Sequence, residues 1–204
     1  MDQSKTWMRI QSSSDLFYLH PWADQAPVNI IKLCKALSIT LKLEPMDHEL
    51  LAMVHIRDGH PIIGANMLLP KYGLRMVVAR NIAHCILHAE EVRAAVAFTI
   101  HRNGCSVPDE KADLNLAKMH MDATRFAREL LLPETALEMA LAKHALSVQL
   151  VNLDFPDVRE DKALVKVAAT MKVPLQTLLA RIAELQGANQ ASAAIMAPPQ
   201  TAKE

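Results

Sequence analysis

The chain has 204 residues, of which 51% are hydrophobic and 22% charged, so it is long enough for a domain with a substantial core. Lysine plus arginine and aspartate plus glutamate both number 22, which removes the general electrostatic argument for a nucleic-acid or membrane-surface protein. The three cysteines show no C-x-x-C spacing, which argues against a disulfide framework or a structural zinc cage. With no apolar run typical of a signal peptide or a transmembrane helix, we expect a cytoplasmic protein with reduced thiols.

The first half of the chain predicts a helix followed by a small sheet. Residues 1–25 are a polar lead-in that contains both tryptophans. The apolar spacing that follows is first helical and then strand-like. Asp58-Gly59 between two apolar runs is a strong hairpin signal. We therefore predict a helix over residues 28–39 and strands over residues 39–45, 50–56 and 61–70.

The second half predicts helices and a disordered end. Residues 74–98 form a strongly apolar helical pattern, and such a helix should be buried on most of its circumference. Residues 163–185 divide into two helices near Pro174, which is the shape of a helix-turn-helix. Further helices are expected over residues 112–131 and from Glu134, a polar connection over residues 151–161, and a disordered tail over residues 187–204.

The stretch RMVVARNIAHCILH places Arg80, His84 and His88 four residues apart, on one face of a helix. Zinc peptidases place two ligand histidines at this spacing, with a glutamate directly after the first that takes a proton from the metal-bound water. In the register HCILH, Cys85 occupies the position of that base, and a thiol is a poor replacement. In the register RNIAH, Arg80 occupies a ligand position and Asn81 that of the base, and neither can do the chemistry.

The surrounding residues resemble the ImmA/IrrE family of zinc-peptidase-like proteins, whose pattern reads RFTxAHELGHxxLH. Arg75, Ala79, His84 and His88 stand where the family has its arginine, its alanine, its second metal histidine and its trailing histidine. The strand IIGAN, with Asn66, is similar to the opening of the family domain. Downstream, DATRFARELLLP resembles the family's E-A-N-x-F-A-x-x-L-L-M-P. The resemblance covers roughly residues 26–186.

The resemblance favours the RNIAH register, Arg80-Asn81-Ile82-Ala83-His84, in which only His84 survives from the family's H-E-x-x-H. The family's acidic third ligand corresponds to Asp122 or to His120, and the sequence leaves this register open. We expect no catalytic residue and no bound cofactor, zinc included. A metal site, if one exists, would draw on His84, His88, His120 and Asp122. We expect the Arg80 guanidinium to enter the old site and to pair with Asp122.

The resemblance implies an α+β fold, a mostly helical zincin-like peptidase scaffold with a small three-stranded sheet. The division that we predict along the chain is a lead-in over residues 1–25, a peptidase-fold domain over 26–150, a helix-turn-helix-like segment over 151–186 and a disordered tail over 187–204.

Active members of the family cleave or inactivate helix-turn-helix repressors of mobile elements or stress responses. The resemblance therefore implies a regulator, with a phage or mobile-element setting by analogy. Because the catalytic set is degraded, we expect it to bind a partner protein, a helix-turn-helix repressor, without cutting it. Two alternatives stay open. One is a zinc peptidase rearranged around His84 and His88. The other is a regulator that contacts DNA through Gln176, Thr177 and Arg181, facing outward from the second helix of the helix-turn-helix.

Overall fold

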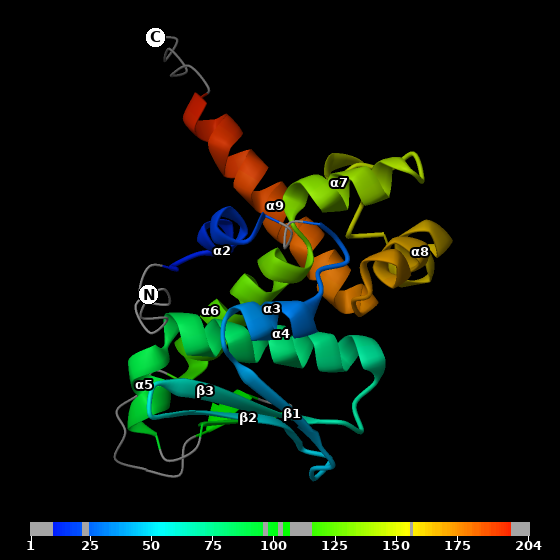
Figure 1. Ribbon diagram of the computed structural model, residues 1–204. Helices are drawn as coiled ribbons and strands as arrows, with labels where there is room; N and C mark the ends of the chain where they lie inside the picture. The colour runs from blue at the N-terminus through cyan, green and yellow to red at the C-terminus, as the bar shows by residue number, and fades with distance from the viewer. Residues whose placement is uncertain are drawn as a thin grey trace.

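The computed structural model describes residues 10–21, 25–95, 98–101, 104–106, 116–155 and 157–196 (Figure 1). Its helices are α2 (Ser13–Leu19), α3 (Ile30–Ala36), α4 (Lys71–Leu87), α5 (Ala89–Ala94), α6 (Leu116–Leu131), α7 (Glu134–Ala142), α8 (Lys162–Met171) and α9 (Leu175–Met196), with short 3-10 turns at Val148–Leu150 and Val158–Glu160. Its strands are β1 (Thr40–Glu44), β2 (Leu50–Arg57), β3 (His60–Asn66), β4 (Phe98–His101) and β5 (Gly104–Ser106).

Within these described residues, five strands form a mixed sheet in the order β1-β3-β2-β4-β5. The predicted hairpin is confirmed: β2 and β3 are antiparallel, and Asp58 and Gly59 between them have φ values of 51° and 77°. Positive φ at both central residues is what a type I′ hairpin turn requires. The predicted α+β class is confirmed as well, and the sheet is larger than the three strands expected, because β4 and β5 extend it beyond β2.

α4 ends earlier than the helix predicted over residues 74–98. It stops at Leu87, and His88 has φ −129° and ψ 36°, outside the helical region. The short helix α5 follows, and Phe98 begins β4. An apolar run does not distinguish a buried helix from a buried strand, which is why the sequence pattern merged α4, α5 and β4.

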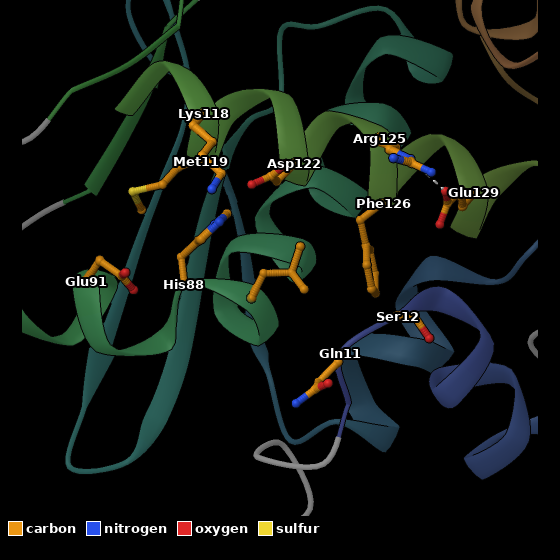
Figure 2. Close-up of a pocket in the computed structure, with 11 residues that line it drawn as sticks. Gln11, Ser12, His88, Glu91, Lys118, Met119, Asp122, Arg125, Phe126 and Glu129 are labelled. Carbon is orange, nitrogen blue, oxygen red and sulfur yellow. Dashed lines mark hydrogen bonds and ion pairs between the residues drawn. The ribbon is translucent and has the colours of Figure 1, made fainter. Parts of the chain in front are cut away.

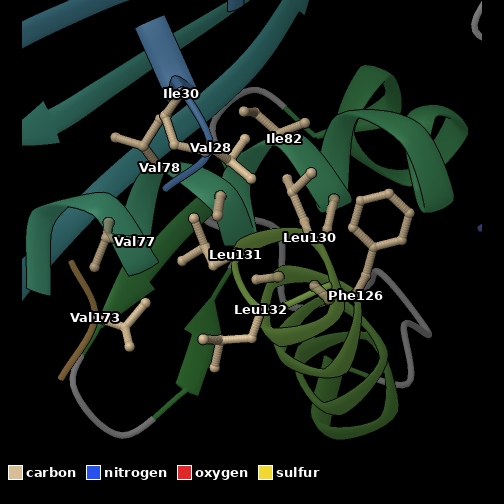
Figure 3. Packing of buried hydrophobic residues seen from close by; sticks show 14 of the residues in the cluster. Val28, Ile30, Val77, Val78, Ile82, Phe126, Leu130, Leu131, Leu132 and Val173 are labelled. Atoms are coloured by element: carbon tan, nitrogen blue, oxygen red, sulfur yellow. The ribbon is translucent and has the colours of Figure 1, made fainter. Parts of the chain in front are cut away.

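α4 lies across one face of the sheet and is covered on another side by α6 (Figure 1). Every residue from Val77 to Ile86 is buried, as the apolar pattern predicted. Figure 3 shows apolar side chains of the two helices packed together, Ile82 of α4 and Leu130 of α6 among them. The helix that carries the RNIAH stretch is therefore held firmly by the packing around it.

α8 and α9 have the predicted helix-turn-helix shape. Lys172, with φ 57°, ends α8 in the left-handed conformation, and the directions of the two helices differ by 98°. Leu164 of α8 and Ile182 of α9 belong to the same buried cluster as the residues of α4 and α6. The segment therefore packs on the rest of the fold as part of a shared core.

The predicted tail is helical in its first part, because α9 continues to Met196. Residues 197–204, residues 1–9 and 22–24 of the lead-in, and the start of the helix predicted over residues 112–131 lie outside the described residues. No single helix in the described part of the chain has both the length and the apolar character needed to cross a bilayer.

Candidate functional site

The site is built on α4, which presents Arg80, Asn81 and His84 inside the protein. Arg80 is 8% exposed, and Asn81 and His84 are fully buried. A buried arginine is uncommon, because its charge is costly to remove from water unless its donors are satisfied. The contacts of this arginine therefore decide what the site can do.

The guanidinium of Arg80 reaches across to α6. Its Nη1 lies 3.3 Å from Nε2 of His120. Because a guanidinium only donates hydrogen bonds, Nε2 must accept, which fixes the ring as a neutral tautomer with its proton on Nδ1. Burial, and secondarily the Arg80 charge, lower the pKa of His120, which is consistent with a neutral ring.

His84 and His88 form a second contact, at the end of α4. Their Nδ1 atoms are 3.1 Å apart, so one ring donates and the other accepts a hydrogen bond. The His84 ring also packs on Phe98 of β4, with centroids 4.8 Å apart. Burial holds the pKa of His84 well below its ordinary value of 6.5, and the neighbouring His88, Arg80 and His120 lower it further. Sequence reasoning missed Phe98, because it lay at the end of the predicted helix.

The structure brings His120, and not Asp122, to Arg80. Asp122 is exposed on α6 and lines the same cavity as His88. Burial lowers the pKa of the His88 ring, and the charges of Glu91 and then Asp122 partly oppose that shift. Two residues apart on a helix are separated by about 200° around its axis, so His120 and Asp122 cannot both face Arg80. The predicted pairing of Arg80 with Asp122 is therefore wrong, and Arg80 instead donates a hydrogen bond to the His120 ring.

Asn81 stands where the family has its catalytic base. Its Nδ2 donates to the carbonyl of Val77 at 2.8 Å, one turn earlier in the same helix. Its Oδ1 is buried and has no hydrogen-bond partner among the described residues. A neutral amide, fully enclosed, cannot take up a proton from a water molecule.

These residues do not fit a zinc ion in the family's arrangement. The first ligand position holds the permanent cation of Arg80, whose guanidinium already bonds Nε2 of His120. Nδ1 of His84 is paired with His88. Among the residues that the structure describes, no three histidine, cysteine or acidic side chains converge as a metal site. The site thus places the guanidinium cation of Arg80 between α4 and α6.

An open cavity of about 690 Å³ lies beside this buried cluster, between α4, α6 and the segment before α2 (Figure 2). His88 lies at its inner wall, and the charged side chains of Glu91, Lys118, Asp122 and Arg125 line it. The cavity reaches His88 but not Asn81 or His84, which are completely covered. A partner chain in this cavity would meet charged side chains and not Asn81 or His84.

Arg75, the arginine of the family pattern, has a structural role. Its Nε donates to the carbonyl of Lys172 at 3.0 Å, and its Nη2 donates to the carbonyl of Val28 at 2.9 Å. It thereby joins α4 to the turn before α9 and to the residues before α3. The resemblance singled out this residue, but nothing local in the sequence showed the two distant carbonyls.

Asn66, at the end of β3, is 1% exposed and organises the loop between β1 and β2. Its amide donates to the carbonyls of Met46, Asp47 and Leu50 at 3.3, 3.1 and 3.0 Å. Its Oδ1 accepts from the backbone N–H groups of Met46 and Leu68 at 3.3 and 3.1 Å. Asn66, the asparagine of the family pattern, therefore holds the loop between β1 and β2 in place.

The expectation that Arg181 faces outward from α9 is wrong. Its side chain is 12% exposed and its Nη1 lies 3.7 Å from the Glu129 carboxylate and 3.6 Å from that of Glu184. Arg128 of α6 donates to the same Glu184 at 2.9 Å. These charges tie α9 to α6, and the sole arginine of α9 is not available to a phosphate.

A helix with the ligand positions of a zinc peptidase, lying on a mixed sheet and facing a second helix that carries the third position, defines a zincin-like peptidase scaffold. A family model described as "IrrE N-terminal-like domain" matches residues 34–183. The chain belongs to this family, as the sequence motifs predicted. Comparison with curated proteins gives no significant match.

Proposed function

We propose that the protein is a catalytically inactive member of its family that binds a partner protein, a helix-turn-helix repressor, and alters the activity of that partner without cleaving it. The observation that carries this proposal is the Arg80 guanidinium, 3.3 Å from His120. A permanent cation at a ligand position opposes a second cation there, and Asn81 offers no base.

The cavity beside His88 is the proposed contact surface. It lies at the end of α4, the helix that carries His84, and it is open to solvent. Its exposed charges, Lys118, Asp122 and Arg125 among them, suit a polar interface that gives specificity. Regulation of transcription and a mobile-element setting follow only from the family resemblance.

The test is capture of the partner with the tagged full-length chain, followed by intact mass measurement of what is captured. The matched experiment uses the double variant Lys118→Glu, Arg125→Glu, which reverses two exposed charges at the cavity. The control reverses Lys162 and Lys166, two exposed lysines of α8 away from the cavity.

We expect the wild type and the α8 control to capture an intact helix-turn-helix protein, and the cavity variant to lose it. Recovery of the partner as defined fragments, with fragmentation abolished by His84→Ala, would instead support the rearranged peptidase. Binding of promoter DNA by the chain alone, weakening as salt increases, would favour the DNA-binding alternative.

A further inference from the structure

A second concave surface lies near the start of α4, toward the opposite end of the helix from His88. It is an apolar groove of about 340 Å³ between α3, β1 and the first turns of α4. We call it the β1 groove. Its apolar lining includes Ile30, Ile31, Leu41, Leu43, Leu74 and Val78.

The β1 groove exists because the helices do not cover the edge of the sheet. Leu41 and Leu43 of β1 pair in register with Ile63 and Ala65 of β3, so they face the same side of the sheet as those fully buried residues. Leu43 is nevertheless 49% exposed, and Ile31 of α3 is 60% exposed. Exposed large apolar side chains that gather around one concave surface indicate a contact site, whereas scattered ones are ordinary on a protein surface.

The backbone of β1 is open along the same edge. β1 is the first strand of the sheet and pairs only with β3 within the described residues. The carbonyl of Glu44 accepts from Met67 at 2.9 Å, so Glu44 and every second residue before it direct their hydrogen-bonding groups toward β3. The backbone groups of Leu41 and Leu43 therefore point to the free edge, where an added strand would find them.

The charge around the β1 groove has one sign. Lys71, Arg75 and Lys172 line it, and none of the described residues that line it is acidic. Arg75 donates to the carbonyls of Val28 and Lys172. The ammonium groups of Lys71 and Lys172 are exposed and form no ion pair within the described part of the chain. They are available to carboxylates of another molecule.

We propose that the β1 groove binds an extended, acidic segment of a partner protein, which pairs with the free edge of β1 and places bulky apolar side chains in the groove. Its flanking carboxylates lie near Lys71 and Lys172. Strand addition supplies backbone hydrogen bonds, and the apolar anchors and charges supply specificity. This surface is separate from the cavity beside His88, and the proposal stands whether or not the partner proposed above is a repressor.

The test is binding of short labelled peptides to the full-length chain, measured by fluorescence anisotropy. The probe is a peptide with two leucines separated by one threonine and flanked on each side by two glutamates. One comparison peptide has lysines in place of the glutamates, and another has serines in place of the leucines.

The protein variants are Ile31→Asp, which adds a charge at an exposed position, and the double reversal Lys71→Glu, Lys172→Glu. The controls place comparable changes elsewhere: Met139→Asp at the exposed methionine of α7, and the double reversal Lys162→Glu, Lys166→Glu on α8.

We expect the acidic probe to bind the wild type and both controls equally, and to bind Ile31→Asp and the double reversal at least about tenfold more weakly. The double reversal should instead prefer the lysine peptide, a gain that an unfolded variant would not show. The proposal is overturned if the wild type binds the acidic probe no better than the serine peptide, or if the groove variants bind it like the wild type.

Discussion

Nη1 of Arg80 on α4 donates a hydrogen bond to Nε2 of His120 on α6, over 3.3 Å, and so links the two helices. We expect the two residues to be energetically coupled. In a double-mutant cycle of Arg80→Met and His120→Leu, the coupling free energy should be about 1.5–3 kcal/mol, the range for a hydrogen bond with a charged donor. Urea unfolding of the four proteins measures it.

The control for this cycle is the exposed pair of Glu90 and Arg93 on α5, where solvent screens the charges. Its coupling should stay below about 0.5 kcal/mol. Additive effects of Arg80→Met and His120→Leu would show that the contact does not join the helices.

The buried, neutral His84 makes stability depend on pH. Burial, followed by the effects of His88, Arg80 and His120, lowers its pKa well below 6.5 in the folded protein. Protonation therefore favours the unfolded chain: stability is unaffected by this group above pH 6.5 and falls as the pH drops below that value. The contribution is at most about 1.4 kcal/mol per pH unit.

Urea titrations between neutral pH and about pH 5 test this dependence. His84→Gln removes the titrating ring, so it should flatten the decline even though it lowers stability at neutral pH. His144→Gln, at an exposed position on the loop after α7, is the matched control and should leave the slope unchanged. An unaltered slope in His84→Gln would mean that the ring is not held neutral.

Asn66→Ala should lower the free energy of unfolding by about 2–4 kcal/mol, because it leaves several buried backbone groups without partners. Asn152→Ala is the comparison, since that exposed side chain accepts, among the described residues, only from Asp154 in its own turn. It should cost less than about 1 kcal/mol. Equal losses of unfolding free energy in the two variants would contradict the organising role of Asn66.

The sequence predicts those parts of the fold whose signals are local. The turn at Asp58 and Gly59 needs positive φ at two residues, and this pair of residue types is typical of such a turn. The break of α4 at His88 has no such signal, because the residues that follow it are ordinary in a helix. β4 and β5 were missed for a related reason: their pairing is set by β2, far away in the sequence.

The candidate site shows the same limit. His120 and Asp122 both flank the buried stripe of α6, which includes Ala123 and Phe126. Periodicity places the two residues on opposite borders of the stripe but cannot say which border meets α4. The way α6 crosses α4 decides it, and that packing puts His120 against Arg80.

The zinc content of the full-length chain, purified from zinc-supplemented cells without chelators, distinguishes an inactive scaffold from a working metal centre. We expect far less than one zinc per chain in the wild type. The content should rise toward about one in Arg80→His, where the introduced imidazole, His84 and His120 would supply three ligands. If adding His84→Ala to Arg80→His abolishes this gain in zinc content, the ion is bound at His84. About one zinc per wild-type chain, lost in His84→Ala, would show that the site is a metal centre after all.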